Sequence, residues 1–172
     1  VKAIGGIRSE SPGTIDVDFV GNVFIGGRFE DTVDFDPGPG TVNLTSGGSY
    51  DGFVVKLDTD GNHQWAGRVG GASWLTIDSI AVNNAGYTYA TGGFSGTADF
   101  DPGAGTRSET ALGFDGFVLK LEPDGVFNRV TRLGSAGGES GGNAIAIDGS
   151  GGAYVCGTLK GTVDFDPGPG VV

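Results

Sequence analysis

Aspartates at a repeated spacing are the residues of this chain whose type and pattern could do chemistry. The stretch Asp34–Gly40 reads Asp-Phe-Asp-Pro-Gly-Pro-Gly, and it returns almost unchanged at Asp99–Gly105 and again at Asp164–Gly170. Alternate residues of an extended segment face the same side, so both carboxylates of each stretch can point together while the phenylalanine between them points into the fold. Carboxylates and the carbonyl oxygens of a Gly-Pro loop are ligands that calcium takes. The pattern therefore raises calcium binding as a hypothesis.

A further aspartate begins the next apolar segment of the repeat and extends the candidate site. Under the calcium hypothesis the metal ligands are Asp34, Asp36, Asp51, Asp99, Asp101, Asp115, Asp164 and Asp166. The alternative is local and structural. An aspartate before proline favours a turn, and its carboxylate can accept a hydrogen bond from the backbone two residues further on. Both interpretations are open on the sequence alone.

No group of residues predicts catalysis. The chain has one histidine, His63, and one cysteine, Cys156, and they lie in different repeats. A zinc site needs several such ligands, and a cysteine nucleophile needs a base beside it. We therefore expect no catalytic residue and no enzyme activity.

The charge of the chain excludes one class of partner. Its formal net charge is −11 and its isoelectric point is about 4.2. Binding to nucleic acid needs clustered Lys and Arg against phosphates, so we expect no nucleic-acid partner. No apolar run reaches the length of a transmembrane segment, and we expect no membrane insertion.

The fixed period of the aspartate stretches indicates a repeat architecture. Asp34 and Asp99 are 65 residues apart, as are Asp99 and Asp164. Within the middle repeat four segments are rich in β-favouring residues and are separated by turn residues, and none has the 3.6-residue apolar spacing of a helix. These segments are Ser79–Val82, Tyr87–Phe94, Asp115–Leu121 and Val126–Leu133. Four short strands per repeat are typical of a β-propeller blade.

The same unit can be laid over the whole chain. Residues 1–7 match the fourth strand of a preceding blade, 8–71 and 72–135 form two blade repeats, and 136–172 form the first half of a third. The fold class we predict is all-β, with propeller-type four-stranded blades in about 2.7 repeats of 65 residues and an incomplete ring.

Several of these segments also carry a family resemblance. Asp51–Trp65, Gly70-Gly71, Ile80–Val82 and Tyr87–Gly92 resemble the bacterial SBBP-type β-propeller repeat, and the resemblance covers most of each repeat. The Asp-Phe-Asp-Pro-Gly loop departs from the shorter generic repeat and looks like a longer variant of planctomycete-type surface proteins. The resemblance implies an extracellular or cell-surface location and supplies no catalytic residues.

Two functions follow as expectations. The first is a non-enzymatic extracellular or cell-surface structural or interaction module that self-assembles through blade edges, with calcium stabilisation as a hypothesis. The alternative is a propeller that binds a carbohydrate or protein ligand, or an enzyme, with its site on the central axis. The close similarity of the repeats favours the first. Its partners would be further copies of the chain in a homo-oligomer or filament, with a neighbour docked beside the strand Gly152–Gly157. The alternative is that the chain is an excerpt of a longer array of repeats, which supplies the strands that this sequence lacks.

Overall fold

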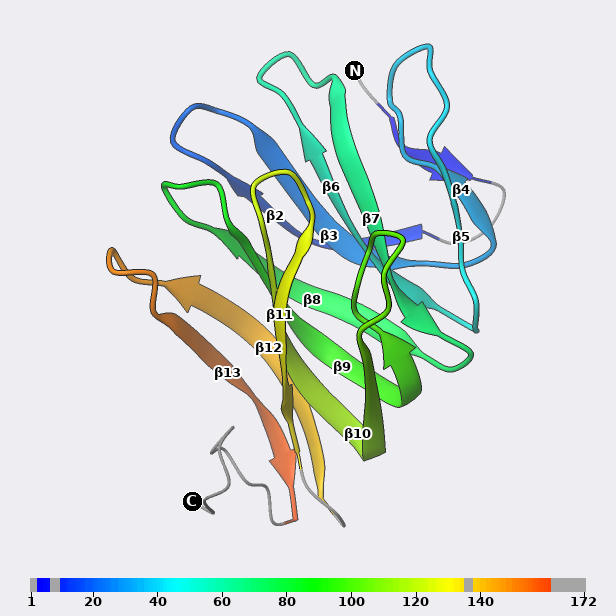
Figure 1. The fold of residues 1–172 in the computed structure, drawn as a ribbon, viewed down its shortest axis with the longest axis vertical. Helices are drawn as coiled ribbons and strands as arrows, with labels where there is room; N and C mark the ends of the chain where they lie inside the picture. The colour runs from blue at the N-terminus through cyan, green and yellow to red at the C-terminus, as the bar shows by residue number, and fades with distance from the viewer. Residues whose placement is uncertain (1–2, 7–9, 135–137, 162–172) are drawn as a thin grey trace.

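The computed structural model describes residues 3–6, 10–134 and 138–161, and it is an all-β structure. Figure 1 shows strands alone in this part of the chain, so the all-β expectation is confirmed. None of these residues form a helix that is long and apolar enough to cross a membrane.

Four strands form the first sheet unit. They are β2 (Glu10–Val17), β3 (Val23–Phe29), β6 (Asp51–Leu57) and β7 (His63–Gly71). Each pairs antiparallel with the next in that order. The segments alternate apolar residues with polar or small ones and are rich in Val, Ile and Phe, which is why they form strands. The turns between them hold glycines at positive φ, such as Gly21 and Gly61.

The second sheet unit repeats this arrangement. It contains β8 (Leu75–Val82), β9 (Thr88–Asp99), β10 (Ser108–Leu121) and β11 (Phe127–Leu133), again antiparallel in chain order. The third sheet unit begins with an antiparallel pair, β12 (Glu139–Ile147) and β13 (Ala153–Lys160).

A small sheet precedes and flanks the first unit. It holds β1 (Gly5–Gly6), β4 (Thr32–Asp34) and β5 (Asn43–Thr45) in the order β1-β4-β5. Gly5 pairs with Asp34 in the small sheet, as Gly70 pairs with Asp99 between β7 and β9. The N-terminal strand thus holds the same position before the first unit that β7 holds before the second.

The three units join into one curled sheet of ten strands, with the path β13-β12-β10-β9-β7-β6-β3-β2 and with β8 and β11 branching from it. The joints are short: β7 meets β9 through two residue pairs, and β10 meets β12 through Phe114 and Glu139 alone. Figure 1 shows the result as a half-barrel. Its shape is consistent with an incomplete propeller-like fold.

Each sheet unit has two faces. The N-side face of a unit is directed at the preceding unit in the chain, and the C-side face at the following one. The largest core cluster lies between the C-side face of the first unit, with Phe24 and Val54, and the N-side face of the second, with Ile77, Ile80 and Phe117. Strands buried on both faces need apolar residues on both, which these have.

The phenylalanine of the Asp-Phe-Asp stretch is buried, as expected, and in the first unit it lies in a second core cluster. Phe35 is fully buried, and its ring centroid lies 5.3 Å from Phe29 and 4.9 Å from Phe53. A matching cluster of Phe94, Phe100 and Phe117 gives 5.2 Å and 4.9 Å for the equivalent pairs. In the two described stretches the phenylalanine therefore anchors the aspartates to their own sheet unit.

Hydrogen bonds fix the register between stacked units. The Ile80 amide donates to Thr14 Oγ1 at 3.1 Å, and the Ile145 amide donates to Ser79 Oγ at 3.2 Å. Donor and acceptor are 66 residues apart in both bonds. The second unit therefore packs on the first in the same register as the third packs on the second.

We expect Thr14→Val to destabilise the chain by about 1–3 kcal/mol, because it leaves the amide of Ile80 without its acceptor in a buried place. Thr41→Val is the control, since Thr41 is exposed and its loss should cost less than about 0.5 kcal/mol. Denaturant unfolding measures both. Equal free energies of unfolding for the two variants would contradict the register-fixing role of Thr14.

Candidate functional site

The first aspartate stretch is held by its own backbone. Asp34 Oδ1 accepts hydrogen bonds from the amides of Asp36 at 3.0 Å and Val42 at 2.8 Å. These bonds, with Val42 first, hold the pKa of Asp34 below its usual value. Asp36 Oδ1 in turn accepts from the amide of Gly38 at 2.7 Å. Both carboxylates therefore organise the turn in the way that the structural alternative requires.

The second stretch repeats these bonds. Asp99 Oδ1 accepts from the amides of Asp101 at 3.0 Å and Arg107 at 2.8 Å, and Asp101 Oδ1 accepts from Gly103 at 2.8 Å. The third stretch, with Asp164 and Asp166, lies outside the described residues.

The third candidate ligand of the first repeat makes an ion pair. Asp51 is fully buried, and its Oδ2 accepts from Arg68 Nε at 2.5 Å and from the amide of Gly47 at 2.7 Å. Its Oδ1 accepts from the amide of Gly71 at 3.2 Å. The carboxylate thus ties β6 to the end of β7 and to the loop before β6.

Asp115 repeats this role in the second unit. It is fully buried, and its Oδ2 lies 2.5 Å from a terminal nitrogen of Arg132. Acid and arginine are 17 residues apart in both repeats. Across residues 3–6, 10–134 and 138–161 the structure brings no group of three or more His, Cys, Asp or Glu side chains together at a place that could hold a metal ion. Calcium stays a prediction, and the carboxylate of Asp51 is already paired with Arg68.

The two arginines are the residues that sequence reasoning missed. Arg68 and Arg132 occupy matching positions near the ends of their fourth strands, and a search for co-repeating opposite charges would have found them. A second signal is the glycine two residues after each arginine. Gly70 and Gly134 adopt φ of 152° and 146°, and a Cβ on either would lie within 2.5 Å of the Asp51 or Asp115 carboxylate.

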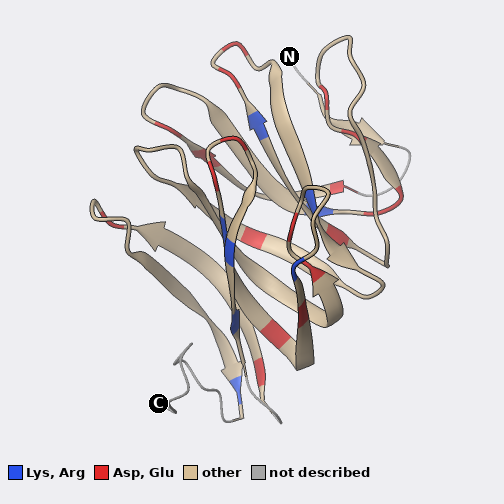
Figure 2. Cartoon of the chain, in the orientation of Figure 1, with Lys and Arg blue, Asp and Glu red and all other residues tan. Residues whose placement is uncertain are grey.

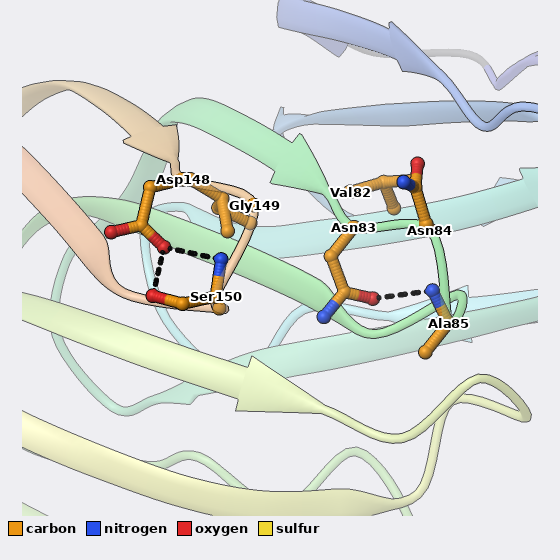
Figure 3. A pocket seen from close by; sticks show the side chains of 9 residues that line it. Val82, Asn83, Asn84, Ala85, Asp148, Gly149 and Ser150 are labelled. Atoms are coloured by element: carbon orange, nitrogen blue, oxygen red, sulfur yellow. Dashed lines mark hydrogen bonds between the residues drawn. The ribbon is translucent and has the colours of Figure 1, made fainter.

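A polar hollow of about 310 Å³ lies between two neighbouring hairpin turns, β8–β9 and β12–β13. Figure 3 shows the two turns facing each other, each held by its own side chain: Asn83 Oδ1 accepts from the amide of Ala85, and Asp148 Oδ1 from Ser150. The Ser150 hydroxyl, the Gly152 amide and the Tyr154 hydroxyl lower the pKa of Asp148 to about 2. These acceptors serve the turns themselves.

Acidic side chains gather in the hairpin turns. Figure 2 shows acidic residues, Asp or Glu, in the turns β2–β3, β6–β7, β10–β11 and β12–β13, which lie toward one end of the sheet. Asp18 and Asp58 fold back on their turns in the same way, each accepting from the amide of an asparagine four residues later at 2.8 Å. The turns are stabilised by these bonds, and their residues need no ligand to be satisfied.

An apolar hollow of about 450 Å³ lies beside β13. It is lined by Val118 and Leu133 of the second unit and, among residues of the third unit, by Val155, Gly157 and Leu159. A second apolar hollow, of about 220 Å³, lies on the N-side face of the first unit among Ile25, Phe35, Phe53 and Leu57. Unlike the aspartate stretches, these hollows are lined by few polar groups. They are suited to contact with apolar side chains of another protein segment.

Protein-family models and curated proteins were both compared with the chain, and neither comparison found a match. His63 and Cys156 lie on β7 and β13 respectively, and Cys156 is a free, exposed thiol.

We expect Arg68→Met to destabilise the chain by about 2 kcal/mol or more. Losing one partner of a fully buried pair costs about 3–5 kcal/mol, and the side chain of Arg68 is 34% exposed, which reduces that cost. The matched control is Arg107→Met, which removes a surface pair with Glu109 and should cost about 0–1 kcal/mol. Denaturant unfolding compares the two. A smaller effect for Arg68 than for Arg107 would show that the Asp51 pair is not structural.

The calcium hypothesis has its own measurement. If calcium binds the folded chain, added calcium raises the thermal midpoint by mass action and EDTA lowers it. Asp36→Asn, which keeps the size of the side chain but removes a charged ligand, should then reduce the shift. A midpoint that moves with neither calcium nor EDTA would contradict calcium binding at the aspartate stretches.

Proposed function

We propose that the chain is a non-enzymatic structural or interaction module, built of propeller-type four-stranded blades, which self-assembles by packing its sheet units on those of other copies. The first and second sheet units and the beginning of the third correspond to the blades, and β1 to the last strand of a blade before them. An extracellular or cell-surface location belongs to the same proposal and rests on the SBBP-type resemblance.

The observation that carries this proposal is a repeated packing mode with one face left open. Ile80 on the N-side face of the second unit packs against the first unit and is 5% exposed. Ile15 holds the equivalent position on the first unit, 65 residues earlier, and is 66% exposed. Both residues are isoleucines at the same position of the first strand of their unit. The difference in their exposed fractions therefore arises because no sheet among the described residues covers Ile15.

Other side chains extend the open face. Val17 is 52% exposed, whereas its counterpart Val82 is partly buried against the core between the units. The apolar hollow at Phe35 and Phe53 lies on the same side of the first unit. Phe35 and Phe53 are themselves buried, as Phe100 and Phe117 are in the second unit, so the exposed apolar residues of this face are Ile15 and Val17. The face therefore offers the residues that form an internal interface elsewhere in the chain.

We expect the purified chain to self-associate at micromolar concentration, with a mass above that of a 17.3 kDa monomer in multi-angle light scattering. Val17→Asp should shift the population toward monomer, because it places a charge on the open face. Val126→Asp is the control: Val126 is 56% exposed, in the turn before β11. A monodisperse monomer for the unsubstituted chain, or an equal loss with Val126→Asp, would contradict self-assembly through this face.

A further inference from the structure

The apolar hollow beside β13 lies at the place that a third strand occupies in the complete units. Its floor is Val118 of β10 and Leu133 of β11, and its wall is β13 with Val155, Gly157 and Leu159. In the sheet path β13 is the last strand, and among the described strands it pairs with β12 alone. Figure 1 shows β13 at the outer edge of the curled sheet.

The corresponding place in the second unit is filled by a strand. There β10 pairs antiparallel with β9, and its Phe117, Leu119 and Leu121 are at most 1% exposed. The floor beneath them is Val54 and Val69 of the first unit, which are 1% and 2% exposed. In the first unit β6 occupies the same place beside β3.

The floor of the hollow shows the effect of lacking that strand. Val118 and Leu133 are the counterparts of Val54 and Val69, yet both are only partly buried. Leu159 is 52% exposed, although its counterpart Phe94 is fully buried. The apolar surface is therefore present, and the strand that would cover it is not among the described residues.

β13 also keeps the residue that lies opposite the third strand's phenylalanine in the complete units. Gly27 of β3 pairs with Phe53, and Gly92 of β9 pairs with Phe117. A Cβ on Gly27 or Gly92 would lie within 2.4 Å of a backbone oxygen of the neighbouring first strand, that of Ser11 or Thr76, so these glycines permit the close pairing of the first two strands of the unit. Gly157 holds this position in β13, 65 residues after Gly92.

We propose that the free edge of β13 and the hollow beside it bind an extended peptide strand in which Phe, an aliphatic residue and Leu alternate toward the floor. The template is the third strand of each complete unit, Asp51–Leu57 or Asp115–Leu121, which reads Asp-Gly-Phe-Val-(Val/Leu)-Lys-Leu. The peptide adds antiparallel to β13, with its phenylalanine opposite Gly157, and its backbone satisfies the open edge. This inference rests on the proposed interaction role and names the partner of one of its surfaces.

The test uses a synthetic peptide of residues 115–123, labelled at its N-terminus, and the whole chain. Fluorescence anisotropy measures binding, and hydrogen exchange locates it. We expect saturable binding and slower exchange of the amides in 153–160. A peptide with Phe117→Ser, Leu119→Ser and Leu121→Ser should bind at least about tenfold more weakly, because it loses the apolar side chains that face the floor.

A matched pair of chain variants tests the site. Leu159→Asp should weaken binding at least about tenfold, because Leu159 lines the hollow. Leu112→Asp should leave binding unchanged, since Leu112 is 51% exposed, as Leu159 is 52%, and lies outside the hollow. No saturable binding of the unsubstituted peptide would overturn the proposal. Equal binding of the serine peptide, or an equal loss in both variants, would also overturn it.

The result can be separated from that of the self-association experiment. If the peptide fails to bind while light scattering shows oligomers that Val17→Asp disrupts, the assembly proposal stands and the strand slot is wrong. If the chain is a monomer and the peptide binds beside β13, the slot is right and the assembly proposal is wrong.

Discussion

The structure depends on the packing of one sheet unit on the next. Each unit is a thin antiparallel sheet with large apolar side chains on both faces, such as Phe24 on one and Phe53 on the other. A sheet of this kind is stable only when both faces are covered, because the hydrophobic effect rewards removal of apolar surface from water. A solitary unit would leave its apolar faces in water. Repetition of the unit along the chain supplies the neighbouring sheet that covers them.

Close approach of the units is made possible by small residues on the C-side face. A Cβ on Gly26 would lie 2.9 Å from side-chain atoms of Ile77 and Ile80, and one on Gly52 would lie 2.6 Å from Leu75. The first strand of the second unit can therefore lie directly on the middle strands of the first. The many glycines of the chain, which suggest flexibility by their number alone, here permit dense packing.

Much of the fold could be predicted because the period is visible in the sequence. The four strand segments, their turns and the inward phenylalanine all follow from alternation and turn residues, and the structure shows each of them. The ends of the strands were harder to predict from the sequence. β9 continues to Asp99, so the aspartate stretch begins within a strand that also pairs with β7. That pairing joins residues far apart in the sequence, which local patterns do not encode.

The candidate site was less predictable for an electrostatic reason. A repeated buried aspartate fits a metal site and an ion pair equally well until its partner is known. Asp51 and Asp115 have arginines as partners, and each also accepts a hydrogen bond from a neighbouring backbone amide, that of Gly47 or Leu112. Only the folded structure brings Arg68, from another strand, to Asp51. The spacing of the acids alone therefore could not decide between the two roles.

The third unit differs from the first two at a position that contacts the following unit. Thr14 and Ser79 accept a hydrogen bond from the next unit, whereas the same position in the third unit is Ala144, which is exposed and has no hydroxyl. A sheet unit packed on that face would find no side-chain acceptor for its amide there, and burying an unpaired amide is costly. The C-side face of the third unit therefore departs from the internal interfaces. The hollow beside β13, in contrast, keeps its apolar floor of Val118 and Leu133, and so retains the surface that a third strand covers in the complete units.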